Sequence, residues 1–400
     1  MKLRNLITVL TTVIMLLISS VGALTASAEV KVRAASTVDV GENEQILEAM
    51  PAKAIAVAEC TTGELLFAKN CENVMPISHL AKLMTLLIAA QMLESKELSL
   101  DDIVTVSDNA NSQEGAQIWL DKGEKIRLEE LIKAITIGNA NDACTAVAEH
   151  ISGNEEEFVK LMNSEARRLG MTSTVFADCT GMSEETVSTA ENMTRLAAEL
   201  LKYEQLRDYL TCWMDTVREG KAELVSQNRL IRTYKGITGM KACASQSAGE
   251  CSVVTAEKRN MKIAVVILGC DLDSNREDIA KKLLDLSFES FSLYTPEITK
   301  DMLKAVPVTG GETDKVGVSF GRLKPVIIPK GSSYSFDITF DKQESAAAPV
   351  KKGAELGSLE CTLGGEVMYS AKLTATGSVE KMNFKCGFKK LMYNLLEFDW

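Results

Sequence analysis

The sequence has few of the residues from which metal centres and nucleic-acid interfaces are built. It contains only 2 histidines in 400 residues, too few for a His-rich metal site. Its 10 cysteines include no Cys-x-x-Cys pair, so neither a zinc ribbon nor a ferredoxin-type cluster is expected. Acidic residues outnumber basic ones by 55 to 44, and the formal net charge of -11 argues against a general nucleic-acid binder. We therefore expect no metal, no other cofactor and no nucleic-acid partner.

The composition is otherwise that of a folded protein. Hydrophobic residues make up 46% of the chain and charged residues 25%, which excludes bulk disorder. A length of 400 residues is too great for one small module. We expect two domains, or one large domain with an appendage.

The N-terminus has the pattern of a secretory signal peptide. Lys2 and Arg4 precede an apolar stretch over Leu6–Leu24, and Ala26-Ser27-Ala28 is a small-x-small cleavage site. The alternative is an uncleaved anchor helix. We predict a signal peptide over residues 1–28 and a mature protein outside the cytoplasm. Disulfides can form there, but the sequence does not specify their pairing, and some cysteines are expected to be plain buried side chains.

The mature chain divides by pattern into three parts. Residues 45–295 mix strand and helix signals and predict an α+β domain, and residues 296–380 read as short strands with Gly and Pro between them. Residues 381–400 have helical spacing. In the first part we predict strands at 54–59, 65–68, 252–256 and 261–269, and helices at 78–94, 128–137, 143–151, 155–169 and 276–294.

Three stretches contain candidate chemistry: Pro76–Thr85, Gly138–Asp142 and Tyr234–Ser245. In the first, a buried Lys82 near a helix start would have a lowered pKa and could serve as a general base. The alternative is a lysine whose amine reaches solvent from a helix end. Each stretch alone is equally compatible with an ordinary helix terminus or turn.

Their order is more specific than any one of them. The stretches PISHLAKLMT, NANDA and YKGITGMKAC, followed by Ala248-Gly249-Glu250-Cys251, resemble the motifs of the serine D-alanyl-D-alanine carboxypeptidases, the low-molecular-mass penicillin-binding proteins. The resemblance runs from about residue 45 to at least 380. It implies a β-lactamase-like domain, an antiparallel sheet with helices, followed by a small β-rich domain. It also implies acyl transfer on peptidoglycan stem peptides ending in D-Ala-D-Ala.

The resemblance assigns a role to each motif position, and several positions depart from the family pattern. Lys82 stands where the family has its general base, but His79 occupies the position of the nucleophilic serine. In the second motif the serine is replaced by Asn139, which cannot relay a proton as a hydroxyl does, while Asn141 is retained. Lys241 is retained at the start of the third motif.

The third motif departs from the family at the next two positions. Ala242 and Cys243 replace a threonine that binds the terminal carboxylate and a glycine. Ser245 lies where the family often has threonine and could keep one contact. Because glycine leaves room for close approach to a strand, Cys243 is expected to narrow the cleft. The alternative is a buried thiol that points away from it.

Ser78 is the obvious candidate for a substitute nucleophile. It lies four residues before Lys82, on the same side of a helix. The flanking residues nevertheless align His79 with the nucleophile, which leaves Ser78 about 100° of helix away. The interpretation we favour is that the Ser78 hydroxyl caps the helix N-terminus.

The tail has a parallel in related proteins, which carry a C-terminal amphipathic helix on the outer face of the cytoplasmic membrane. Its apolar residues at helical spacing are Phe384, Phe388, Leu391, Met392 and Leu395, with lysines at 381, 385, 389 and 390 and a terminal Trp400. This pattern predicts interfacial membrane binding, although Gly387 weakens the helix. The alternative is a helix packed on the β-rich domain.

Two hypotheses about function follow from these residues. The changed motif positions favour a catalytically impaired pseudoenzyme that binds stem peptides or a cell-wall partner. The alternative is an active D-Ala-D-Ala carboxypeptidase with Ser78 as an unusual nucleophile. A structural, adhesin-like role of the β-rich domain has no specific residue behind it.

Overall fold

The computed structural model describes residues 45–271, 275–296, 298–299, 302–321, 325–330, 336–363 and 365–396. The predicted signal peptide over residues 1–28 and the terminal Trp400 lie outside the described residues. The chain forms two compact units. The first falls within Ala34–Tyr294 and Pro325–Ser332, and the second within Thr295–Lys324 and Ser333–Trp400.

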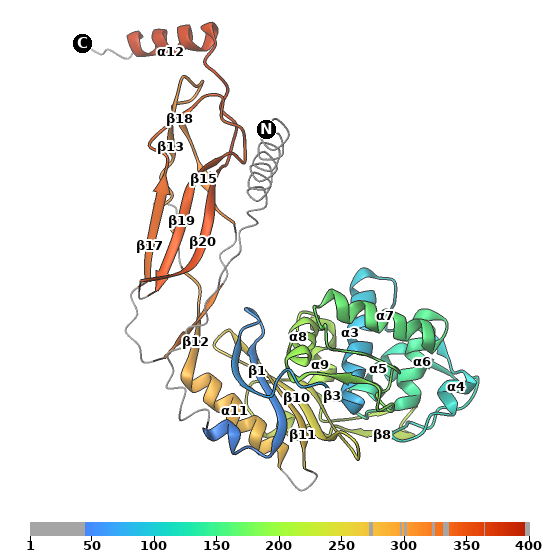
Figure 1. Cartoon of the computed structure of the whole chain (residues 1–400). Helices are drawn as coiled ribbons and strands as arrows, with labels where there is room; N and C mark the ends of the chain where they lie inside the picture. Colours follow the sequence, from blue (N-terminus) through green and yellow to red (C-terminus); the bar gives the residue numbers. More distant parts are fainter. Residues whose placement is uncertain are drawn as a thin grey trace, which may run out of the picture. The chain divides into compact units, whose positions relative to one another are not determined.

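A five-stranded antiparallel sheet is the centre of the first unit, with the strand order β2-β1-β11-β10-β9 (Figure 1). The strands are β1 (Ala52–Glu59), β2 (Leu65–Lys69), β9 (Ile237–Ser245), β10 (Gly249–Lys258) and β11 (Met261–Cys270). The strands predicted at 54–59, 65–68, 252–256 and 261–269 are thereby confirmed.

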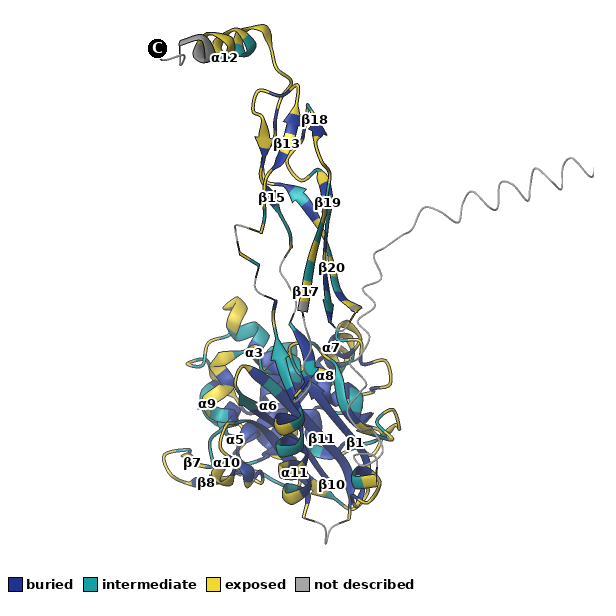
Figure 2. Cartoon of the chain, turned by 90° about the vertical axis from the view of Figure 1, so that its left-hand side faces the viewer, coloured by how far each residue is buried: buried dark blue, intermediate teal, exposed yellow. Residues whose placement is uncertain are grey.

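Successive residues of β1 point into two different hydrophobic cores. Ala54 and Ala56 belong to the core that the sheet shares with most of the helices. Ile55 and Val57 belong to the core on the opposite face, which includes residues of α11 (Arg276–Ser290). Both faces are therefore covered, and the strands are buried almost throughout (Figure 2).

The other helices come mainly from the stretch between β2 and β9. They are η1 (Ser78–Ala81), α3 (Lys82–Ser95), α4 (Asp108–Asn111), α5 (Leu128–Thr136), α6 (Asn141–Ser152), α7 (Glu155–Arg168), α8 (Ala190–Leu200), η2 (Glu204–Leu206), α9 (Arg207–Leu210) and α10 (Leu230–Thr233). Three short pairs connect them: β3 (Met75–Pro76) with β6 (Val187–Ser188), β4 (Ile103–Thr105) with β5 (Lys125–Arg127), and β7 (Met214–Val217) with β8 (Ala222–Val225).

The helix predicted over 276–294 is too long. It ends at Ser290, and β12 (Phe291–Tyr294) pairs with β16 (Val326–Pro329). The Phe291 ring packs edge-on against Phe67, with 5.7 Å between ring centroids. Aromatic packing and ladder hydrogen bonds thus prevail over continuation of the helix.

The second unit is rich in β-structure. Its strands are β13 (Val306–Thr309), β14 (Lys315–Val316), β15 (Val318–Ser319), β17 (Phe336–Lys342), β18 (Ala346–Ala347), β19 (Glu355–Leu363) and β20 (Glu366–Ala375). They form a three-stranded sheet, β14-β13-β18, and a four-stranded sheet, β15-β20-β19-β17. Buried valines, alanines and a leucine fill a small core of this unit.

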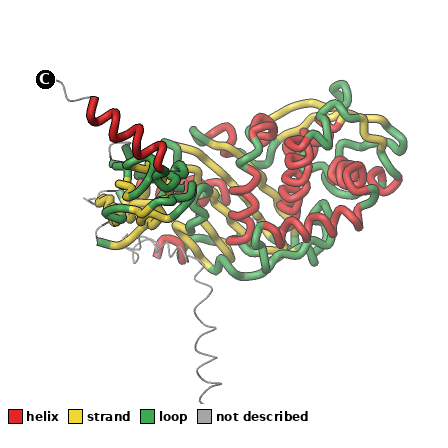
Figure 3. Tube along the Cα trace, turned by 90° about the horizontal axis from the view of Figure 1, so that it is seen from above, coloured by secondary structure: helices red, strands yellow, loops and turns green. Residues whose placement is uncertain are grey.

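The described chain ends in α12 (Phe384–Leu396), where the tail was predicted to be helical (Figure 3). Phe384 is 89% exposed and Phe388 55% exposed, and their rings stack on each other. Lys390 forms an ion pair with Asp314 of the same unit. In the part of the chain that the structure describes, no helix is long and apolar enough to cross a membrane.

Candidate active site

The amine of Lys82 joins the first two motifs. Lys82 is fully buried at the first position of α3. Its Nζ donates to Asn141 Oδ1 over 2.6 Å and to the Thr180 carbonyl over 2.9 Å, and it lies 2.9 Å from His79 Nδ1. Burial lowers the pKa of Lys82 below its usual range. The structure therefore brings together the first-motif and second-motif residues that the sequence singled out.

His79 lies directly beside this amine. Its ring is half-buried, and burial, followed by the nearby charge of Lys82, lowers the pKa of His79 to about 4. The imidazole is therefore neutral at pH 7. While Lys82 is an ammonium, Nδ1 accepts from it and Nε2 carries the ring proton. When Lys82 is neutral, Nδ1–H can donate to the Thr180 carbonyl, 3.1 Å away.

The interpretation of Ser78 as a helix cap is wrong. The residue in the N-cap position of η1 is Ile77, and no side chain caps this helix. Ser78 is instead the first residue of η1, has a φ of 48° and is 5% exposed. Within the described residues its hydroxyl has no hydrogen bond, and the Lys82 amine contacts His79 instead. A left-handed backbone and a close neighbour explain the difference from a normal cap.

That close neighbour is Gly181. Its φ is +79°, and a Cβ there would lie 1.9 Å from the Ser78 carbonyl oxygen. Only glycine can bring the backbone this close. The 178–182 segment is therefore pressed against η1, which also places the Thr180 carbonyl next to Lys82 and His79.

Lys241 is a second buried amine with three acceptors. Its Nζ donates to the carbonyls of Ile135 and Thr136 over 2.7 and 3.2 Å, and to Asn139 Oδ1 over 2.6 Å. Burial, and secondly the charge of Lys82, lowers the pKa of Lys241 to about 7. Neither amine has a carboxylate among its hydrogen-bond partners, so each is hydrogen-bonded to neutral acceptors.

Asn139 links the second and third motifs. Its φ of 59° is left-handed, a conformation that asparagine adopts more readily than most residues. Its Oδ1 accepts from Lys241, and its Nδ2 donates to the Ala242 carbonyl over 3.2 Å. The Asn139 side chain thus bonds directly to two residues of β9.

The other third-motif residues offer few free polar groups. Ala242 is buried and contributes only a methyl group. The Cys243 thiol is fully buried and lies 3.9 Å from the Ile77 carbonyl. The Ser245 hydroxyl accepts from the Ala248 backbone N–H over 3.1 Å and thereby shapes the β9–β10 turn.

The sequence analysis missed residues that complete the surroundings of Lys82. Thr180 lies 98 residues away along the chain and acts through its backbone carbonyl, which no side-chain motif reveals. Two buried free thiols lie nearby, since Cys144 Sγ donates to the Cys179 carbonyl over 3.1 Å. Among the described residues no group of three or more His, Cys, Asp or Glu side chains could hold a metal ion.

Known families match both units. A family model described as D-alanyl-D-alanine carboxypeptidase matches residues 37–271. A model of the penicillin-binding protein 5 C-terminal domain matches residues 288–381. The chain belongs to the D-alanyl-D-alanine carboxypeptidase family, whose members function in cell-wall metabolism.

Individual relatives cover most of the chain. It is 32% identical to the D-alanyl-D-alanine carboxypeptidase DacF of Bacillus subtilis, over 87% of this chain and 90% of the relative. It is 28% identical to DacC of Escherichia coli, over 85% of this chain and 88% of the relative. Penicillin-binding protein 5 from Haemophilus influenzae has a TM-score of 0.73 at 24% identity, covering 83% of this chain and 98% of that structure. The predicted fold class, an α+β penicillin-binding domain followed by a β-rich domain, is confirmed.

The low pKa of His79 gives a pH prediction. Its unfolded pKa is about 6.5, above the folded value of about 4, so the unfolded state takes up the proton first as pH falls. The contribution of neutral His79 to the free energy of unfolding is complete above pH 6.5 and is lost as the pH falls from 6.5 to 4. From pH 7.5 to 5 the wild type should lose up to about 2 kcal/mol more stability than His79→Gln.

The measurement combines urea denaturation at both pH values with NMR titration of the imidazole carbons. The only other histidine, His150, is exposed, and the His79→Gln spectrum distinguishes the two signals. A midpoint for His79 near 6.5 would contradict the predicted burial effect.

Proposed function

We propose that this chain is a catalytically impaired member of its family that binds peptidoglycan stem peptides ending in D-Ala-D-Ala, or a cell-wall partner, without turnover. The observation that carries the proposal is the 2.9 Å contact between Lys82 Nζ and His79 Nδ1. A general base must reach the hydroxyl it activates. Here an imidazole occupies that position.

The hydrogen bonds of the remaining motif residues support impaired chemistry. Lys82 already has three acceptors, so its amine is held in a saturated arrangement. Asn139 bridges Lys241 and the Ala242 carbonyl, and its amide cannot shuttle a proton at neutral pH. Turnover through Ser78 is less well supported, because its buried hydroxyl has no hydrogen bond to Lys82 among the described residues.

The retained residues support binding. The retained Lys82, Lys241 and Asn141, together with Asn139, place two amines and two amides in one buried region, a suitable set of donors for a peptide with a terminal carboxylate. The relatives are named as D-alanyl-D-alanine carboxypeptidases, which points to the D-Ala-D-Ala end of the stem peptide. Binding without acylation would make the chain a receptor for this group.

Penicillin labelling tests the loss of chemistry. The wild type should form no acyl-enzyme, and His79→Ser alone should restore little. The quadruple variant His79→Ser, Asn139→Ser, Ala242→Thr, Cys243→Gly should be measurably acylated, because each absent transition-state contact costs roughly 10²–10³ in rate. These costs are not additive.

The assay is labelling of the full chain by a fluorescent penicillin, with mapping of the modified peptide. The quadruple variant with Lys82→Ala is the matched control and should remain unlabelled. Stoichiometric labelling of the wild type, or rapid labelling of His79→Ser alone, would contradict the proposal. A label on Ser78 would establish the alternative nucleophile.

We also propose that the mature protein acts on the outer face of the cytoplasmic membrane, secreted through residues 1–28 and held by α12. The exposed Phe384, Phe388 and Leu391 support interfacial binding, since they leave an apolar stripe in solvent beside the lysines. Among the tail lysines, Lys390 is the one whose side chain has a described ion pair, with Asp314.

A vesicle assay tests the role of α12. Removal of residues 381–400 should release the protein from anionic vesicles, and Phe384→Ser with Phe388→Ser should weaken binding at least tenfold, because two exposed rings no longer enter the interface. Val367→Ser is the control, because Val367 is also apolar and 47% exposed but lies on β20. Equal partitioning of the full and truncated chains, measured by sedimentation, would show that α12 is not an anchor.

A further inference from the structure

Trp119 is the most exposed large apolar side chain of the first unit. It is 72% exposed, and its φ of 61° is left-handed, a strained conformation for a bulky residue. Tryptophan is highly buried on average, and a positive φ is uncommon for a bulky residue. Both features call for an explanation outside the core.

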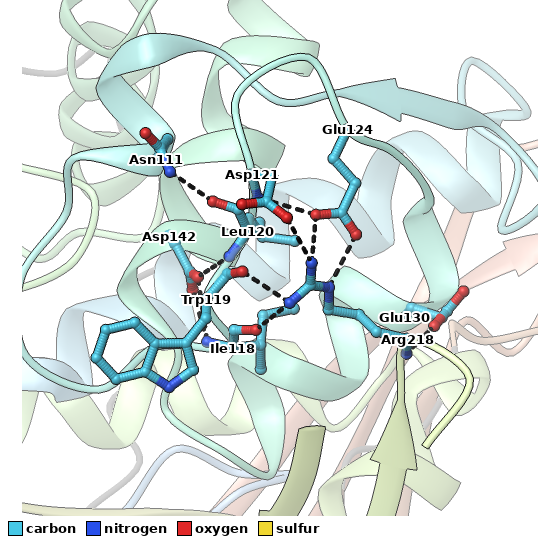
Figure 4. A network of polar contacts seen from close by, with 9 residues as sticks. All are labelled: Asn111, Ile118, Trp119, Leu120, Asp121, Glu124, Glu130, Asp142 and Arg218. Carbon is cyan, nitrogen blue, oxygen red and sulfur yellow. Dashed lines mark hydrogen bonds and ion pairs between the residues drawn. The ribbon is translucent and has the colours of Figure 1, made fainter. Parts of the chain in front are cut away.

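The backbone around this residue is clamped from two sides (Figure 4). Arg218 Nη1 donates to the carbonyls of Ile118 and Trp119 over 2.9 and 2.7 Å. The carboxylate of Asp142 accepts from the backbone N–H groups of Ile118 and Leu120, at 3.1–3.2 Å. The backbone on both sides of the tryptophan is therefore fixed, while its side chain is left in solvent.

The two clamping groups are themselves held in place. Asp142 is 1% exposed. Arg218 also binds Glu124 through Nε and Nη2, at 2.8 and 2.6 Å. In Figure 4 the indole points away from Arg218 and its acidic partners, so neither clamping group uses the aromatic face. The network thus fixes the backbone of Trp119 and leaves the indole exposed to solvent.

The clamp is continuous with the candidate active site. Asp142 directly follows Asn141, whose side chain accepts from Lys82. The Asn141 backbone N–H donates to the Ala116 carbonyl over 2.6 Å, and Asn141 Nδ2 donates to the Glu114 carbonyl. Three residues of chain reach at most about 10 Å, so Trp119 stands within that distance of Ala116. Of these two neighbouring residues of α6, Asn141 therefore binds the Lys82 amine, and Asp142 binds the backbone on either side of Trp119.

A second exposed apolar residue borders the same site. Met182 is 50% exposed and lies two residues after Thr180, whose carbonyl contacts His79 and Lys82. A Cβ on Gly115 would lie 3.7 Å from Met182 Sδ and 2.9 Å from Asn141 Nδ2. Met182 and Asn141 thus both lie next to Gly115, so a second exposed apolar side chain borders the candidate active site.

We propose that Trp119, assisted by Met182, is a binding subsite for the peptide stem that precedes the terminal D-Ala-D-Ala of the ligand. The inference rests on the proposed function and names the part of the ligand that this side of the site recognises. A planar indole offers a large rigid apolar face at low entropic cost, suited to aliphatic side chains and peptide planes. The polar motif residues hold the carboxylate end, and Trp119 holds the stem.

Calorimetric titration of the full chain with two probes tests this assignment. The probes are a synthetic pentapeptide, L-Ala-γ-D-Glu-L-Lys-D-Ala-D-Ala, and acetyl-D-Ala-D-Ala. Wild-type protein should bind the pentapeptide at least about tenfold more tightly than acetyl-D-Ala-D-Ala. Trp119→Ala should remove that advantage, as is common for an aromatic anchor that becomes buried on binding. Trp119→Phe should keep most of it, and Met182→Ala should lose a smaller part.

Leu161→Ala is the matched control, because Leu161 is an exposed apolar residue on α7. Equal pentapeptide binding by wild type and Trp119→Ala would overturn the subsite and leave the proposed function intact. No binding of either probe by the wild type would overturn the proposed function, and the subsite with it.

A second variant tests the clamp. Arg218→Met leaves the indole in place but frees the carbonyls of Ile118 and Trp119. It should weaken pentapeptide binding several-fold and lower the fluorescence anisotropy of Trp119 in a background with Trp213→Phe and Trp400→Phe, while acetyl-D-Ala-D-Ala binding stays unchanged. Unchanged anisotropy and affinity would show that Arg218 does not position the indole.

Discussion

The buried amine of Lys82 is the constraint on which the site depends. An ammonium removed from water needs acceptors, and a lysine without a carboxylate partner must obtain them from neutral groups. In this chain they come from three separate segments: the turn with His79, the start of α6 with Asn141, and the 178–182 segment with Thr180. The need to satisfy one buried amine therefore fixes how these segments meet.

Lys241 is also a buried amine that is hydrogen-bonded only to neutral groups, with two backbone carbonyls and the Asn139 amide oxygen as acceptors. The two amines also interact, because the charge of Lys82 lowers the pKa of Lys241. Burial thus lowers the pKa of both amines in the unliganded protein. A ligand carboxylate would favour the charged form of either amine, so binding of an anion and uptake of a proton are thermodynamically linked.

Much of this fold follows from local sequence patterns, whereas the site follows from them only in part. The run Ala54-Ile55-Ala56-Val57 predicts a strand, and helical spacing places α5, α6 and α7. The motif positions Lys82, Asn141 and Lys241 were found through a resemblance. The roles of Thr180, Asp142 and Arg218 were not found in this way. Each of these residues makes a hydrogen bond that involves a backbone group and joins distant parts of the sequence. The Ser78 cap failed because tertiary contact with Gly181 imposes a left-handed backbone.

The substituted residues do more than remove hydroxyls. Asn139 adds a bond to the Ala242 carbonyl, and Cys243 fills space against Ile77, so the two sides of the site are joined by internal contacts. Such contacts stabilise the unliganded state, and a ligand that needs the same donors must displace them. Loss of chemistry and weaker recognition of the D-Ala-D-Ala end would then have a common origin. Affinity would have to come from contacts outside the motifs, which is where a rigidly presented Trp119 contributes.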